Sequence, residues 1–277
     1  MSSKVFSIDD VSVVRDGFTI LEDINWTVES GQHWAVLGAN GSGKTSLLKV
    51  LMGYLTPTTG GVTMRNRGEA ALQGDRDWDE WRYRVGFVSS SISEMVDPNE
   101  QAIEVVMAGR HGMVNYWTHE DPAKDVAAAD RILKRLGAMD IRDKYWLNLS
   151  QGERQRILIG RAMMAPKMDM LILDEPCAGL DPVARESFLS FIEELTLKKT
   201  FKSLVIVTHH VEEIIPSVTH SLLLKEGKMV SSGPKRMALN SRHVSTTFGS
   251  DLRLRSRLGR YRLYFDDEEE LAPGRII

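Results

Sequence analysis

The chain has 277 residues, of which 42% are hydrophobic and 26% charged, with a formal net charge of −3. This composition is typical of a soluble globular protein, and the length allows one large domain or two smaller ones. The small net charge excludes a general attraction to nucleic acid or to an anionic membrane surface. No apolar run approaches the roughly 18 residues of a membrane-spanning helix, and the acidic start lacks the apolar stretch of a signal peptide. The single cysteine, Cys177, excludes an internal disulfide and suits the cytoplasm.

The first part of the chain predicts short strands. Four apolar runs between residues 5 and 38 are separated by turn-forming residues such as Asp9 and Asp10. A glycine-rich turn follows the last run, and an amphipathic stretch then continues to Pro57. The order is therefore strand, loop and helix.

The rest of the chain alternates helical patterns with apolar strands. Residues 99–148 have helical spacing, and apolar strands are expected at 170–174 and 203–208, each next to a helical pattern. Such alternation predicts a largely parallel sheet covered by helices on both faces. Residues 222–233 predict a hairpin with a glycine turn. The fold class is therefore α/β.

The segment GANGSGKT, Gly38–Thr45, matches the phosphate-binding pattern of Gly, four residues, then Gly-Lys-Ser/Thr. Glycines let successive N–H groups point at phosphate oxygens, and the helix that follows adds its positive end. Lys44 would reach the β- and γ-phosphates and the Thr45 hydroxyl would ligate Mg²⁺. An ordinary flexible turn is the alternative, but the strand–loop–helix setting favours a phosphate loop. The predicted nucleotide-binding residues here are Gly38, Asn40, Gly41, Ser42, Gly43, Lys44, Thr45 and Ser46.

The segment MLILDEP, at 170–176, is an apolar strand that ends in two carboxylates. Asp174 would hold Mg²⁺, commonly through water, and Glu175 would polarise a water that attacks the γ-phosphate. The alternative is that both acids only cap the next helix. Beside a phosphate loop, we favour the catalytic interpretation.

Between these motifs lies LSQGE, Leu149–Glu153, which opens a helix with Ser150 as its N-cap. Its position ahead of the Asp-Glu strand makes the chain resemble the nucleotide-binding domain of the ATP-binding cassette (ABC) family. AGLD at 178–181 resembles the D-loop of that family, and VTHH at 207–210 resembles its switch-histidine segment. The resemblance covers roughly residues 4–240.

This resemblance implies a P-loop NTPase cassette in residues 1–240. It would have a parallel-sheet core, an N-terminal antiparallel β layer and a helical subdomain at about 95–160. In the family, two cassettes pack head to tail and enclose two ATP molecules, each held by one phosphate loop and the other chain's signature. ATP holds the pair closed and hydrolysis opens it. By this resemblance Glu175 and His209 are catalytic, Asp181 is in the D-loop, and the signature contacts are Ser150, Gln151, Gly152 and Glu153.

The resemblance also implies partners. A homodimer forms on ATP binding, and the cassette serves most often as the cytoplasmic motor of a transporter, on the inner face of the plasma membrane with a separate membrane-spanning chain. The segment 104–117 resembles cassettes of metal-ion or metal-chelate importers. Two alternatives remain. A soluble cassette ATPase could act on nucleic acid or an assembly complex, although the single phosphate loop argues against it. A regulatory module could sense ATP, although Glu175 and His209 argue against that.

Three positions depart from the family pattern. Arg15 is where an aromatic normally stacks on adenine; its guanidinium plane can stack too, Phe18 is an alternative, and both could be turn residues. Ser90 is where a glutamine reaches Mg²⁺ and the attacking water. Because serine is shorter, we expect slow hydrolysis and an altered link to whatever the cassette drives, with Ser89, Ser90 and Ser91 lining the site rather than only ending a strand. His210 replaces a frequent Asp and is interpreted as a surface residue.

Residues 241–277 form a tail outside the cassette, for which the pattern predicts a short hairpin with arginines facing water. A strip that binds RNA or acidic lipid is the alternative, which the acids at 266–270 would partly neutralise, so nucleic acid is not the favoured partner. Four tryptophans pack in the core or mark a docking surface. The arginines are Arg253, Arg255, Arg257, Arg260 and Arg262, and the tryptophans are Trp78, Trp81, Trp117 and Trp146.

Overall fold

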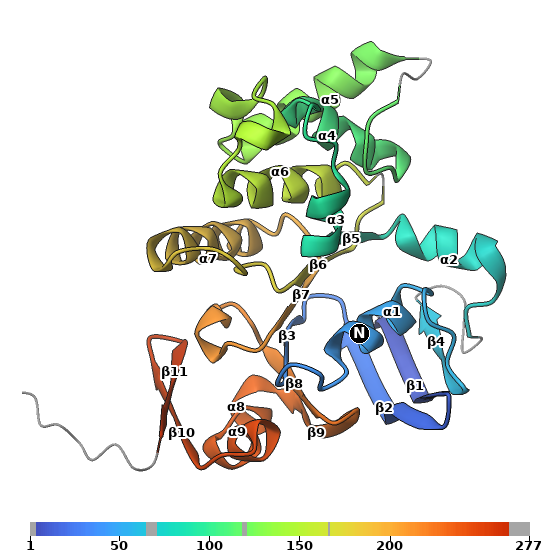
Figure 1. Ribbon diagram of the computed structural model, residues 1–277, viewed down its shortest axis with the longest axis vertical. Helices are drawn as coiled ribbons and strands as arrows, with labels where there is room; N and C mark the ends of the chain where they lie inside the picture. The colour runs from blue at the N-terminus through green and yellow to red at the C-terminus, as the bar shows by residue number, and fades with distance from the viewer. Residues whose placement is uncertain (1–3, 65–70, 118–120, 166, 266–277) are drawn as a thin grey trace, which may run out of the picture. The chain divides into compact units, whose positions relative to one another are not determined.

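The computed structural model describes residues 4–64, 71–117, 121–165 and 167–265 (Figure 1). The chain divides into two compact units, each made of three segments. Within the described residues, no helix is long and apolar enough to cross a membrane. Unit 1 comprises residues 1–7, 27–32 and 62–207, and unit 2 comprises residues 8–26, 33–61 and 208–277.

The N-terminal part of the chain contributes three strands to a sheet of order β2-β1-β4. They are β1 (Lys4–Arg15), β2 (Phe18–Glu29) and β4 (Thr59–Met64). The other elements of unit 1 are β5 (Val85–Ser89), β6 (Met170–Asp174), β7 (Ser203–Thr208), α2 (Gly74–Arg82), α3 (Ser90–Met95), α4 (Ala102–Ala108), α5 (Pro122–Arg135), α6 (Gln151–Met163), α7 (Pro182–Leu197) and three 3-10 turns, Gly109–His111, Met139–Ile141 and Trp146–Asn148. Those of unit 2 are β3 (His33–Leu37), α1 (Lys44–Leu51), β8 (His220–Lys225), β9 (Lys228–Pro234), α8 (Lys235–Ala238), α9 (Ser241–Phe248), β10 (Leu252–Arg257), β11 (Arg260–Phe265) and the 3-10 turn Val211–Glu213.

Unit 1 contains three parallel strands in the order β5-β6-β7. All of β7 and the first four residues of β6 are buried, as expected for strands covered on both faces. Helix α6 packs closely against β5, since a Cβ on Gly86 would lie 2.7 Å from Met168 Sδ and 3.0 Å from Ala162 Cβ. The register pairs Ser89 with Asp174, so the carboxyl ends of β5 and β6 end side by side.

The helices α4, α5 and α6 pack on one another at the top of Figure 1. Every residue of α4 except Glu104 is buried. A Cβ on Gly109, directly after α4, would lie 1.9 Å from the Arg161 carbonyl oxygen, so only glycine allows this approach to α6.

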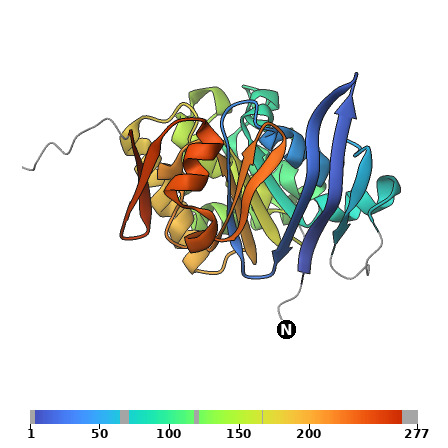
Figure 2. The ribbon, with the colours of Figure 1, turned by 90° about the horizontal axis from the view of Figure 1, so that it is seen from below.

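Unit 2 pairs β3 with β8 in parallel and β8 with β9 antiparallel. The hairpin β10–β11 follows beside α9 (Figure 2). Its register pairs Arg255 with Arg262 and Arg257 with Arg260, and Arg253 pairs with Tyr264, so all five arginines share one face. The acids at 266–270 lie outside the described residues.

The N-terminal strands are longer than the sequence predicts. The runs at 5–8 and 11–14 belong to one strand, β1, although Asp10 has a φ of 50°. Asn25 of β2 explains this continuity, because its Nδ2 donates to Asp10 Oδ1 over 2.9 Å and its Oδ1 accepts from the Asp10 N–H over 3.0 Å. The two acids therefore bend the strand without ending it.

Candidate nucleotide site

The glycine-rich loop between β3 and α1 needs its glycines for two reasons. Gly41 and Gly43 have φ values of 79° and 103°, a region that residues with a Cβ rarely adopt. A Cβ on Gly43 would also lie 2.9 Å from Leu21 Cδ2. Gly43 is the N-cap of α1, so the first N–H groups of the helix, which have no partner inside it, follow directly after this loop.

Lys44 lies at the centre of this loop with only 7% of its surface exposed. Its Nζ donates to the carbonyl oxygens of Gly38 over 2.8 Å and of Ala39 over 3.2 Å. Ser42 Oγ is buried and has no hydrogen-bond partner among the described residues. A buried cation beside an unsatisfied hydroxyl fits an oxyanion ligand.

The loop is braced from outside. The Gly227 N–H in the β8–β9 turn donates to the Ser42 carbonyl over 3.0 Å, and the Glu22 N–H of β2 donates to the Gly227 carbonyl over 2.9 Å. Asn40 and Thr45 of this segment are exposed, and Ser46 directly after it is half-buried. The residues expected to touch a nucleotide thus surround a braced loop.

Arg15 and Phe18 lie on either side of the β1–β2 turn in the same unit. The Arg15 guanidinium donates to the carbonyl oxygens of Val14 over 2.8 Å and of Thr56 over 2.5 Å. Phe18 is 76% exposed. The arginine is therefore engaged with its own backbone, whereas the phenyl ring is open to solvent.

In unit 1 the acid pair ends β6. The Glu175 N–H donates to the Val207 carbonyl over 2.9 Å, and Glu175 has a φ of 48°. A non-glycine residue in this region costs roughly 1–2 kcal/mol, and such strain clusters at functional sites. Asp174 and Glu175 are both half-buried, which leaves their carboxylates accessible.

The three serines divide between a strand and a helix. Ser89 is buried at the end of β5, and its Oγ accepts from the Ile92 N–H over 3.4 Å as the N-cap of α3. Ser90 and Ser91 begin α3 and are exposed. Ser89 therefore has a structural role next to Asp174. Ser90 is the first of the three serines that is exposed to solvent.

The signature segment starts α6 with reciprocal caps. The Ser150 N–H donates to Glu153 Oε2 over 2.7 Å and the Glu153 N–H donates to Ser150 Oγ over 3.3 Å. Lys144 Nζ donates to Glu153 Oε1 over 3.0 Å. Burial raises the pKa of Glu153, but the hydrogen bonds from Ser150 and Lys144 outweigh it and hold that pKa below its usual value. Nothing lies within 4 Å of a Cβ added to Gly152, and Gln151 is half-buried beside it.

The remaining expected site residues lie at element ends. Asp181 accepts from the N–H groups of Val183 and Ala184 over 2.8 and 2.9 Å and so caps α7. After β7, the rings of His209 and His210 lie 4.0 Å apart between centroids; His209 is half-buried and His210 exposed.

Sequence reasoning missed two acids near the signature, because both lie in segments that look like polar turns or helix surface. Glu100 Oε1 accepts from the Tyr116 N–H over 2.7 Å, its carbonyl accepts from the Trp146 N–H over 2.8 Å, and its Oε2 is buried without a partner among the described residues. Burial raises the pKa of Glu100 to about 7, with Glu104 and Asp97 adding to it and the Tyr116 N–H opposing it.

The second missed acid, Asp125 of α5, is 3% exposed. It binds His111 Nε2 over 2.7 Å, the Tyr116 hydroxyl over 3.1 Å and Arg110 Nε over 3.3 Å. These contacts fasten the loop 109–117 to α5.

Comparison with known proteins places this geometry in a family. The family model for ABC transporters matches residues 21–178. The ABC transporter ATP-binding protein YlmA of Bacillus subtilis (strain 168) is 37% identical over 251 residues, which cover 90% of this chain and 92% of that protein. The chain belongs to the ABC transporter family.

Solved structures agree with this assignment at the level of the fold. One is an inward-facing ABC transporter described as metal-chelate type, with a TM-score of 0.75 and 23% identity over 94% of this chain and 96% of that one. Another is the dimeric cassette MJ0796 after hydrolysis, bound to ADP and Pi, with a TM-score of 0.67 and 22% identity over 83% and 98%. The predicted α/β cassette fold is confirmed.

Replacing Glu100 tests the cost of its burial. The pKa of Glu100 in the folded protein, about 7, exceeds its ordinary value of 4.5, so the native state binds this proton more tightly than the unfolded state does. The stability that this proton adds is full below pH 4.5 and is lost as pH rises to 7. Glu100→Gln keeps an oxygen for the Tyr116 N–H and carries no charge. We expect the variant to be the more stable at pH 8 by about 1 kcal/mol, since solvent screening reduces the full value for a half-buried group.

Urea unfolding of the wild type and of Glu100→Gln between pH 4.5 and 8 measures this difference, with the exposed Glu94→Gln as control. Parallel curves for wild type and Glu100→Gln across that range would show that Glu100 is not buried as described.

Proposed function

We propose that this cassette is the Mg²⁺-dependent ATPase subunit of an ABC transporter, working as a homodimer that closes on ATP. The phosphate loop carries the proposal. A lysine ammonium that is 93% buried and donates to two loop carbonyls is poised to exchange those carbonyls for phosphate oxygens. The chain's membership of the family makes ATP the expected ligand.

The family mechanism gives each of these residues a role. Lys44 and the loop N–H groups would bind the β- and γ-phosphates. The Thr45 hydroxyl and Asp174 would hold Mg²⁺, which would neutralise charge that develops on the phosphates. Glu175 orients and polarises the attacking water, and His209 donates to the γ-phosphate. The exposed hydroxyl of Thr45 and the half-buried carboxylate of Asp174 suit an oxygen-ligated cation.

The adenine platform is better supplied by Phe18 than by Arg15. Ile20 and Phe18 lie on the same face of β2 two residues apart, roughly 7 Å along the strand, and the Ile20 carbonyl is 3.5 Å from the Cβ position of Gly43 in the phosphate loop. Phe18 therefore lies within a nucleotide's length of that loop, with an exposed ring on which a base can stack.

Gly152 supports the dimer. Glycine in a helix costs roughly 0.5–1 kcal/mol relative to alanine, and no residue in the described part of the chain lies close enough to require it. We therefore attribute this glycine to a contact outside the chain, in which the γ-phosphate of a nucleotide on the partner approaches the start of α6. The dimeric relative bound to ADP and Pi is a precedent for such a pair.

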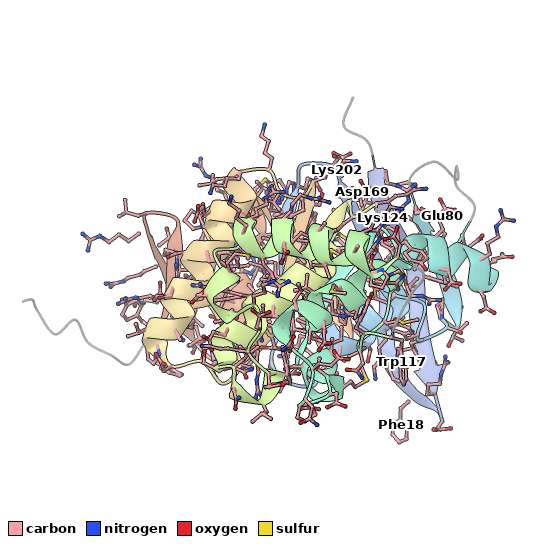
Figure 3. The ribbon with its side chains drawn as sticks, turned by 90° about the horizontal axis from the view of Figure 1, so that it is seen from above. Phe18, Glu80, Trp117, Lys124, Asp169 and Lys202 are labelled. Carbon is pink, nitrogen blue, oxygen red and sulfur yellow. The ribbon has the colours of Figure 1, made fainter. Side chains whose placement is uncertain are left out.

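Four exposed apolar side chains support a membrane-spanning partner, since such patches mark interaction sites. We call them the docking patch; they are Tyr83, Met95, Met113 and Trp117, with exposures of 45%, 56%, 37% and 71%. The loop 109–117 brings them together, because Asn115 Nδ2 donates to the Met95 carbonyl over 3.2 Å and a Cβ on Gly112 would lie 3.9 Å from Tyr83 Cε1. Trp117 is labelled in Figure 3.

Glu175→Gln should leave ATP binding intact and reduce turnover at least 100-fold, because the amide keeps the size of the side chain but cannot polarise the attacking water. Phosphate release measures turnover and nucleotide titration measures binding. Glu194→Gln, on the exposed face of α7, serves as the matched control. Unchanged turnover in Glu175→Gln would refute the assigned role.

Gly152→Ala should retain or slightly raise the melting temperature while preventing the ATP-driven dimer. The added methyl group finds open space within the chain but enters the volume that the partner's nucleotide needs. Calorimetry and light scattering with ATP, both on a Glu175→Gln background that traps the closed state, give the two readouts. A normal dimer in Gly152→Ala would argue against the head-to-tail contact.

The transport assignment is tested by what the trapped protein binds. Glu175→Gln, purified with ATP from its native cells after mild crosslinking, should bring a multi-helix membrane protein in near-equal amount by mass spectrometry. Adding Trp117→Ala should cut that recovery at least five-fold, whereas Tyr54→Ala, at another exposed aromatic residue outside the docking patch, should not. Recovery of soluble proteins or RNA alone would move the function out of transport.

A further inference from the structure

A cavity of 520 Å³ opens in unit 1 at the amino ends of β5 and β6. Arg84 and Asp169 directly precede these strands, whereas Ser89 and Asp174 end them, roughly 16 Å away along five residues. The cavity is therefore separate from the acid pair of the nucleotide site. Its lining residues are Arg84, Ile132, Arg135, Met163, Ala165, Lys167, Met168, Asp169, Thr200 and Lys202.

Four of these side chains are cationic and one is a carboxylate, which leaves three positive charges. Asp169 is fully engaged, because Lys202 Nζ donates to one of its oxygens over 2.5 Å and Arg84 Nη1 donates to the other over 2.9 Å (Figure 3). Burial raises the pKa of Asp169, but these two hydrogen bonds outweigh it and keep the group ionised. The carboxylate therefore offsets only one of the four cations.

Helix ends reduce this charge without cancelling it. Helix α5 ends at Arg135, α6 ends at Met163 beside the cavity, and α7 ends three residues before Thr200. Each carboxyl end contributes roughly −0.5 charge. Even if all three act at full strength and the Glu80 carboxylate beside Arg84 is counted as well, about +0.5 remains in the cavity.

Donors of the right kind are available there. Arg84 Nε is buried and has no partner among the described residues, and Glu80 lies 3.7 Å from Arg84 Nη2 on the other side of the guanidinium. Arg135 donates to Thr200 Oγ1 over 2.8 Å, which uses one of its five N–H groups. Lys167 is exposed at the rim.

One side of the cavity is apolar. Ile132, Met163 and Ala165 belong both to this cavity and to an adjoining one of 360 Å³, to which Arg131 adds further positive charge. A ligand that is an anion at one end and apolar at the other would fill such a shape.

We propose that this cavity is a binding site for a phosphate monoester of a small apolar or aromatic group. Arg135 and Lys167, with Arg84 Nε, bind the phosphate dianion, and the organic part lies on Ile132, Met163 and Met168. The guanidinium fork matches phosphate oxygens in a way that a point charge does not. Binding here does not require an empty nucleotide site, and the ligand could be free phosphate or a phosphate ester, which share the same charged end.

The experiment uses the full-length chain saturated with ADP and Mg²⁺, so that the phosphate loop is already filled. Phenyl phosphate and inorganic phosphate are each titrated by calorimetry. The ADP titration, made first, reports the nucleotide site separately. We expect saturable binding of phenyl phosphate, at least five-fold tighter than inorganic phosphate because of the apolar wall, and a rise in melting temperature as its concentration increases.

Arg135→Ala with Lys167→Ala should weaken phenyl phosphate binding at least ten-fold and leave ADP binding unchanged. Lys134→Ala with Lys124→Ala is the matched control, since it also removes two positive charges, both from α5, at positions that do not line the cavity. Equal binding of the two anions would mean that free phosphate is the ligand and would overturn the ester assignment. Unchanged affinity in the double variant, or binding seen only without ADP, would overturn the site.

Discussion

The buried ammonium of Lys44 is the interaction on which the nucleotide half of unit 2 depends. A charge removed from water must be surrounded by acceptors, and the carbonyl oxygens of Gly38 and Ala39 are two of them. The loop can turn those carbonyls inward only because Gly41 and Gly43 take positive φ values. Bracing by the β8–β9 turn through Gly227 then fixes the loop against β2. The buried charge, the positive φ angles and the Gly227 hydrogen bonds therefore all support the same loop conformation.

Unit 1 meets a different constraint, which is to hold two carboxylates at one strand end. Parallel register places Ser89 beside Asp174, and the left-handed backbone at Glu175 turns the chain immediately afterwards. The hydrogen bond from the Glu175 N–H to β7 supports this turn. Backbone strain that neighbouring strands support is typical of functional sites, which agrees with the catalytic role proposed for Glu175.

Much of this could be predicted, because the relevant chemistry is local. The phosphate loop, the Ser150–Glu153 caps and the alternation of strands and helices each depend on residues within a few positions of one another. The continuity of β1 could not be predicted, because it depends on Asn25, which is distant in sequence from Asp10. The cavity at Arg84 could not be predicted either, since its lining comes from four separate segments.

Helix α6 connects the signature segment with the cavity at Arg84. Its first turn presents the signature, with Gly152 open to a partner, and its last turn forms the apolar wall of the cavity at Met163. Thirteen helical residues span roughly 20 Å, and a helix packed on β5 through Gly86 shifts as one body rather than bending. An anion that ties the end of α6 to the amino ends of β5 and β6 would therefore restrict the signature at its other end. Helix α6 is therefore the element that connects the proposed cavity site with the proposed signature contact.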